Sequence, residues 1–260
     1  MSELKRTPKD AQHFRSPKQE GKDPVKNLLA PYREQLREQR FTIVPTDLIL
    51  PKIERTHIAE TIFSASRIEQ DLAYVNKTRL RSDDALAYRR EATGDTHLEA
   101  LKNYHPDPNR IRIQYTINHP EERHYRRMHG LEVQPIRRLV EAALDLVPEE
   151  DRREEGQFDL HAFRTKDTVV QGWHKDGNEE TPVDWVLSYV VSRSGEGAAT
   201  QIARDANGNE FIHEREVKEG ELIMHKDSDY YHNVTALTGT PGTPTPQQDA
   251  LIMTIRPRLE

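Results

Sequence analysis

The chain has 260 residues, of which 34% are hydrophobic and 32% are charged, and its net charge at pH 7 is −6. It is long enough to bury a substantial core, and no apolar run reaches the roughly 18 residues that a membrane-spanning helix needs. It contains no cysteine, which excludes disulfides, thiolate metal sites and cysteine nucleophiles. The negative charge gives no general attraction to nucleic acid, and the polar first residues lack the apolar segment of a secretory signal, so a cytoplasmic protein is expected.

The first 27 residues are polar and contain Pro8, Pro17 and Pro24. Such a composition predicts a solvated N-terminal tail or arm. Residues 28–260 are expected to form a single domain. The sequence gives no indication of an oligomeric state.

The first half of that domain has mainly helical patterns. Apolar residues recur every three or four positions in three segments, and a proline opens the last of them, as is common in the first turn of a helix. The elements expected in chain order are a helix over 25–40, a strand over 41–44, a helix after Pro51, a strand over 112–117 and a helix over 135–147. The inward positions of the helices are Leu28, Leu29, Tyr32 and Leu36, then Ile53, Ile58, Ile62 and Phe63, then Ile136, Leu139, Val140, Ala143 and Leu144. Residues 66–110 are charged and show no clear period.

The second half has a different pattern. Short runs in which apolar and polar residues alternate are separated by Gly, Asn, Asp and Pro turns, which is typical of a β-sandwich or β-barrel. We therefore predict an α+β fold. A helical portion, about 28–150, packs on a double-stranded β-helix of jelly-roll or cupin-like type, about 157–258.

The tripeptide His-Lys-Asp occurs twice, at 174–176 and at 225–227. A histidine two residues before an acid is half of a common metal site, but about two such pairs are expected by chance in this composition. The chain has five, which begin at His97, His105, His119, His174 and His225. The first lies in a helix-like stretch, where residues two apart do not share a face, and the next two are proline turns. The two His-Lys-Asp copies end extended runs, where residues two apart share a face.

A third ligand distinguishes the two copies. In a double-stranded β-helix the second histidine of a 2-His-1-carboxylate site lies several strands after the first pair, and such a site suits non-haem Fe(II). Between Asp176 and His232 there is room for about four strands. Between Asp227 and His232 there is room for none. The predicted metal ligands, and catalytic residues, are therefore His174, Asp176 and His232, with His225 as a wall or supporting residue.

The last predicted strand offers a possible co-substrate clamp. Ile252, Thr254 and Arg256 alternate on one of its faces, and an arginine there can form two hydrogen bonds to a carboxylate. Taken alone, Arg256 could equally be a surface residue, and Arg258 on the same face is a competing candidate. A dicarboxylate that chelates iron at one end needs such a clamp at the other.

The order and spacing of these features resemble the bacterial 2-oxoglutarate/Fe(II) dioxygenases that include the isoleucine 4-hydroxylase type of amino-acid hydroxylase. The resemblance runs from about Phe158 to Arg256. Its landmarks are FDLHAFRT, GWHKDG, GEGAATQIA, the strand over 220–223, YHNVTAL and DALIMTIRP. Ala162 replaces a glutamine that is common in the family, and the loop after His232 is long.

The resemblance implies that His174, Asp176 and His232 bind Fe(II) and that Arg256, with Thr254 as a hydrogen-bond donor, binds 2-oxoglutarate. It also implies that O2 is consumed to hydroxylate an unactivated C–H bond, with release of succinate and CO2. The expected substrate is a small molecule, an amino acid or a derivative. Nucleic-acid and membrane partners are not expected.

Two residues are candidates for substrate contact, Arg164 through a carboxylate and Tyr230 as part of the pocket wall. A structural ion pair is an equally good interpretation of Arg164. Two other functions stay open from the sequence. One is a cupin-like metal-binding module or isomerase without 2-oxoglutarate, which would have no need of the arginine clamp. The other is an oxygenase for a carrier-bound or peptidyl substrate.

Overall fold

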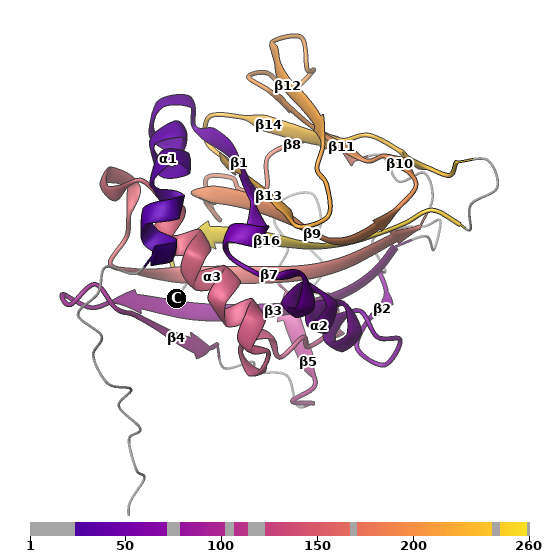
Figure 1. Ribbon diagram of the computed structural model, residues 1–260, viewed down its shortest axis with the longest axis horizontal. Coiled ribbons are helices and arrows are strands. Elements are labelled where there is room, and N and C mark those ends of the chain that lie inside the picture. The colour runs from indigo at the N-terminus through magenta and orange to yellow at the C-terminus, as the bar shows by residue number, and fades with distance from the viewer. Residues whose placement is uncertain are drawn as a thin grey trace, which may run out of the picture.

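The computed structural model describes residues 24–71, 79–101, 107–113, 123–166, 171–240 and 245–258. In these residues most of the regular structure is β-strand, and the α-helices pack on one side of a large sheet (Figure 1). The helices are α1 (Pro24–Gln39), α2 (Lys52–Ile62) and α3 (Gln134–Leu146), with 3-10 turns η1 (Thr46–Leu48), η2 (Gly130–Glu132) and η3 (Glu149–Asp151). No helix in the described ranges is both long and apolar enough to span a membrane.

Two main sheets face each other. The strands of the large sheet are β1 (Phe41–Pro45), β2 (Glu69–Gln70), β3 (Arg79–Arg90), β4 (Thr96–Ala100), β7 (Glu155–Lys166), β9 (Trp185–Ser194), β13 (Glu221–Lys226) and β16 (Gln247–Arg256). Their order is β1-β13-β9-β16-β7-β3-β2, with β4 paired to β3. The strands of the small sheet are β8 (Gln171–His174), β11 (Ala199–Ala203), β12 (Phe211–Glu216) and β14 (Tyr231–Val234), in the order β12-β11-β14-β8.

Two further strand pairs lie beside these sheets. One joins β5 (Arg110–Ile113) to β6 (Arg123–Arg126), and the other joins β10 (Glu196–Gly197) to β15 (Leu237–Thr238). With them, the two facing sheets form a jelly roll. This is the predicted fold class, and it is confirmed.

The large sheet has one face toward the helices and one toward the small sheet, because successive side chains on a strand point to opposite sides. On β16, Leu251 and Met253 are buried in the core that the helices cover. Ala250 and Ile252, between and beside them, line a pocket on the other face. Any residue of the large sheet can therefore be placed inside or outside the barrel from its register.

The expected helices are all present, but two of their expected inward residues lie on the surface. Leu28 is 50% exposed and Ile53 is 79% exposed. Each residue of a helix turns the chain by about 100°, so Ile53 points about 140° away from Ile58, which faces the sheet. Apolar spacing predicted these helices correctly but assigned them too wide a buried side.

The N-terminal half contains more strand than the sequence predicted. The charged stretch 66–110 contains β3, a 12-residue strand in the large sheet. The predicted strand at 112–117 begins within β5, and its residues 114–117 lie outside the described part of the chain. Of the predicted tail, residues 1–23 lie outside it, and 24–27 belong to α1.

Candidate active site

Three side chains converge at the end of strand β8 of the small sheet. His174 is the last residue of β8, Asp176 follows two residues later, and His232 lies opposite His174 on the paired strand β14. The Nε2 atom of His174 is 3.4 Å from Oδ1 of Asp176, and Nε2 of His232 is 3.8 Å from the same oxygen. The three ligand atoms all lie within 4.8 Å of one another, so one metal ion could contact all of them.

The protonation states of Asp176 and His232 fit a divalent metal. Burial alone would raise the pKa of Asp176, but the neighbouring His232 and His174 lower it, so the carboxylate is ionised. Burial lowers the pKa of His232 to about 4, so its imidazole is neutral and can act as a ligand. At His174 burial lowers the pKa, but the interaction with Asp176 outweighs it and the pKa is raised.

Supporting contacts orient the first histidine and the carboxylate. Nδ1–H of His174 donates to the carbonyl of Gly172 at 2.7 Å, which leaves Nε2 for a metal. The backbone N–H groups of Asp176 and Gly177 both donate to Asp227 at 3.0 Å. Burial and the nearby Asp176 charge raise the pKa of Asp227 to about 6.

The second His-Lys-Asp copy thus lies against the first. A second set of possible ligands, His225, Asp227 and His232, shares one histidine with the triad. However, the two oxygens of Asp227 already accept backbone N–H groups. His225 is 2% exposed, its ring lies 4.9 Å from that of His232, and neither of its nitrogens has a hydrogen-bond partner in the described part of the chain. This geometry fits the expected role of His225 as a wall residue.

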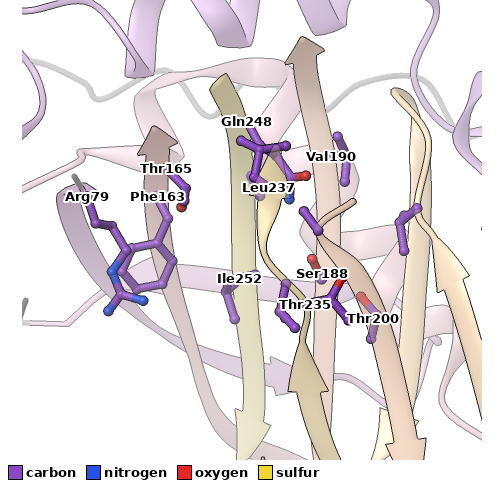
Figure 2. A pocket seen from close by; sticks show the side chains of 14 residues that line it. Arg79, Phe163, Thr165, Ser188, Val190, Thr200, Thr235, Leu237, Gln248 and Ile252 are labelled. Atoms are coloured by element: carbon purple, nitrogen blue, oxygen red, sulfur yellow. The ribbon is translucent and has the colours of Figure 1, made fainter. Parts of the chain in front are cut away.

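A pocket lies between the two sheets (Figure 2). Val234, which lines it, is two residues beyond His232 on the same face of β14. The empty volume of the pocket is about 650 Å³, open solvent included. The described residues that line it are Arg79, Phe163, Thr165, Ser188, Val190, Ala198, Thr200, Val217, Val234, Thr235, Leu237, Gln248, Ala250 and Ile252. Arg79 is the one charged residue among them.

The predicted co-substrate residues are placed elsewhere. Arg256 pairs with Asp159 at 2.7 Å, and the hydroxyl of Thr254 donates to the same carboxylate at 3.2 Å. Neither residue is among those described as lining the pocket. Both lie near the C-terminal end of β16, whereas the pocket extends toward the N-terminal end of that strand, at Gln248.

The predicted substrate residues also lie away from the pocket. Arg164 makes two hydrogen bonds of 2.7 Å to Asp249 and lies near the Phe63 ring, on the face that the helices cover. These contacts agree with the other interpretation of Arg164, a structural ion pair. Tyr230 donates its hydroxyl to the carbonyl of Gln39 at 2.7 Å and packs edge-on against Phe41. Tyr230 therefore connects the start of β14 with the end of α1 through this hydrogen bond.

A charged cluster on the inner face of the large sheet was missed from the sequence. Asp83 accepts from Arg81 Nε at 2.9 Å and from His161 Nδ1 at 2.5 Å. His161 is close enough to Asp176 to help lower the pKa of that carboxyl. The alternation of FDLHAFRT puts His161 on the same face as Asp159, but the partners of His161 lie on β3, a strand that no local pattern predicted.

The comparisons with known proteins agree with this geometry. A family model described as 2OG-Fe dioxygenase matches residues 64–254. Among solved structures, a BsmA homologue from Methylobium petroleophilum is 18% identical, with a TM-score of 0.65 over 88% of this chain and 93% of that one. The structure titled IDO from Bacillus thuringiensis is 16% identical, with a TM-score of 0.64 over 89% and 96%. A prolyl-4-hydroxylase from Pseudomonas putida is 11% identical, with a TM-score of 0.54 over 89% and 100%.

At these identities the structural likeness shows the fold alone, and no curated protein matches the chain. The family match is the stronger finding, because it covers well over half of the chain and includes His174, Asp176 and His232. The protein is thus an oxidoreductase and belongs to the 2OG-Fe dioxygenase family, which uses Fe(II), 2-oxoglutarate and O2.

Proposed function

We propose that this enzyme hydroxylates an unactivated C–H bond of a small substrate, a free amino acid or a close derivative, and releases succinate and CO2 from 2-oxoglutarate. The observation that carries the proposal is the convergence of His174, Asp176 and His232 beside a pocket between the sheets. Two histidines and one carboxylate leave further coordination positions of an Fe(II) ion open for co-substrate and O2.

Each residue of the triad has a definite part in this proposal. Asp176 supplies a negative charge, and His232 supplies a neutral imidazole, because burial keeps its pKa low. His174 is oriented by its hydrogen bond to Gly172. Bound iron supplies the oxidative chemistry, whereas the protein binds and orients the reactants and keeps water out of the space between the sheets.

The lining of the pocket supports a small substrate and co-substrate, because strands of both sheets enclose it and most of its described lining residues are apolar, with a few polar side chains among them. The described lining includes the hydroxyl groups of Ser188, Thr200 and Thr235 and the amide of Gln248, which can form hydrogen bonds with the polar groups of an amino acid.

The test is succinate formation from 2-oxoglutarate by protein reconstituted with Fe(II), measured across a panel of free amino acids. A proline-containing peptide belongs in the panel because one similar structure is a prolyl-4-hydroxylase. We expect succinate with at least one free amino acid, and none with Asp176→Ala. Glu179→Ala, an exposed acid three residues further on, is the matched control. Turnover with the peptide alone would replace the proposed substrate class, and no turnover with any compound would refute the hydroxylase proposal.

A further inference from the structure

We infer that His225 is a positioning residue for His232, and that it acts through one buried water molecule that His225, His232 and Asp227 share. This role rests on the proposed function, because it concerns the support of one of the proposed metal ligands. His225 belongs to β13 in the large sheet, Asp227 follows that strand directly, and His232 belongs to β14 in the small sheet. The shared water thus joins the two sheets at the proposed metal centre.

His232 has one ring nitrogen for the metal and one without a partner. Its Nε2 atom lies 3.8 Å from Oδ1 of Asp176, so Nδ1 carries the ring hydrogen when Nε2 binds a metal. That Nδ1 atom is buried and has no hydrogen-bond partner in the ranges that the structure describes. The other ligand histidine, His174, donates its Nδ1–H to the carbonyl of Gly172. Because metal-bound histidines almost always donate this second N–H group, we expect an acceptor beside His232.

His225 lies against the His232 ring and also needs hydrogen-bond partners. The two ring centroids are 4.9 Å apart, with 56° between the ring planes. His225 is 2% exposed, and neither of its ring nitrogens has a partner among the described residues. Burial holds the pKa of His225 well below its ordinary value, so the neutral ring has one acceptor nitrogen and one N–H donor. Buried polar groups are nearly always hydrogen-bonded to protein or to ordered water, so neighbouring imidazoles without partners call for a molecule between them.

The spacing of the three residues suits a water molecule. One ring nitrogen of each histidine and one carboxylate oxygen of Asp227 all lie within 4.8 Å of one another. Three atoms at such separations can all be reached from one point at about 2.8 Å, the length of a normal hydrogen bond. A water at that point accepts Nδ1–H of His232 and donates to His225 and to Asp227. Three hydrogen bonds are usual for a buried water.

Asp227 has the capacity for this third contact. Its two oxygens accept the backbone N–H groups of Asp176 and Gly177, each at 3.0 Å. An ionised carboxylate has about four acceptor positions, so these two bonds leave room for the water. Asp227 therefore holds the turn that carries Asp176 directly and the ring of His232 through the water. In this arrangement the second His-Lys-Asp copy supports two of the three proposed ligands.

The experiment observes the ring N–H groups of the ligand histidines. Protein labelled with 15N in its histidines and loaded with Zn(II), which has no redox chemistry, is studied by NMR. In the wild-type protein, His174 and His232 should each show one metal-bound nitrogen and one N–H group that exchanges slowly with solvent. The N–H signal of His232 should also show a cross-peak to a bound water.

His225→Leu removes both ring nitrogens of His225 and keeps an apolar side chain in the space. The N–H group of His232 should then exchange with solvent at least about tenfold faster, because a hydrogen-bonded group exchanges only when its bond opens. The N–H signal of His174 should not change. Affinity for Fe(II), measured by anaerobic calorimetry, should fall by about 10- to 100-fold.

Two kinds of variant separate positioning from simple filling of space. His225→Asn and His225→Gln place an amide near one or the other ring nitrogen, and at least one of them should restore slow exchange of the His232 N–H group. His213→Leu is the matched control. His213 also has a buried ring nitrogen without a partner in the described part of the chain, but it lies on β12, two strands from β14. This control should leave both N–H signals in place and Fe(II) affinity within about twofold.

Four results have distinct consequences. His225 is not a positioning residue if His225→Leu leaves the exchange of the His232 N–H group unchanged, or if the 15N shift of His225 shows that it binds the metal itself. Absence of the water cross-peak in the wild-type protein would reject the shared water even if no variant folds. If the wild-type protein shows no metal-bound nitrogen on His174 and His232, the proposed function itself is wrong.

Discussion

The Asp227 carboxylate accepts a hydrogen bond from the backbone N–H of Asp176 at 3.0 Å, so the second His-Lys-Asp copy of the chain holds the first in place. A carboxylate that fixes the turn carrying a ligand affects metal affinity without touching the metal. The two aspartates, which the bare tripeptide does not distinguish, therefore have different expected roles.

Substitution of each aspartate should separate these roles. Asp176→Ala removes a ligand and should abolish measurable Fe(II) binding. Asp227→Ala removes only the support and should weaken binding by about 10- to 100-fold. Anaerobic calorimetry with Fe(II) measures both, with the exposed-site variant Glu179→Ala as control. If Asp227→Ala abolished Fe(II) binding while Asp176→Ala retained it, Asp227 and not Asp176 would be the metal ligand.

Gly177 lies where the ligand-bearing turn passes closest to its neighbours. A Cβ atom there would be 2.4 Å from the backbone nitrogen of Val183 and 3.2 Å from the Asp227 carboxylate. Gly177→Ala should therefore displace the turn, lower the free energy of unfolding by about 1–3 kcal/mol and weaken Fe(II) binding. Urea unfolding and calorimetry measure the two effects. Gly172→Ala is the control, because a Cβ there meets nothing within 4 Å; equal effects of the two substitutions would contradict the steric argument.

Arg164 illustrates a motif residue whose role is structural. Its partner Asp249 is 2% exposed, so Arg164→Met would leave a buried carboxylate without its charge partner. The expected loss is about 3–5 kcal/mol in the free energy of unfolding. Affinities for Fe(II) and 2-oxoglutarate, measured where the variant is folded, should stay within about twofold, since the residue lies on the helix-covered face. A large loss of 2-oxoglutarate affinity with unchanged stability would mean that Arg164 contributes to co-substrate binding and is not only structural.

The sequence predicted the features that local patterns encode. Strand β16 alternates cleanly, and the helix α3 has a complete apolar side, so both were placed to within a few residues. Strand β3 was not, because Arg81, Asp83 and Asp84 are buried as ion pairs and look like surface residues in a pattern of hydrophobicity. The alignment of Arg79, Thr165 and Gln248 in one row across the large sheet depends on pairings between strands far apart in the chain, which no local pattern contains. Consequently the metal triad could be proposed from spacing alone, whereas the far end of the pocket could not.

The buried pair Arg81–Asp83 gives a pH-dependent test of that strand. Burial raises the pKa of Asp83, but Arg81 and His161 outweigh it, so the pKa is lowered below its ordinary value of 3.8. A carboxyl whose pKa is lower in the folded state stabilises the fold above its unfolded pKa, and this stability is lost as the pH falls through the folded pKa. Asp83→Asn should therefore lower the free energy of unfolding by about 3–5 kcal/mol at pH 7.

Urea unfolding of wild-type and Asp83→Asn protein at pH 7, 5 and 3 measures the difference between them. That difference should stay constant from pH 7 to pH 5, because the carboxyl is ionised in both states of the wild-type protein. It should shrink toward pH 3, where the unfolded chain takes up a proton that the folded carboxyl resists. Glu179→Gln, at an exposed acid, should show no comparable change. A difference that grew on acidification would mean that Arg81 and His161 do not keep Asp83 ionised in the folded protein.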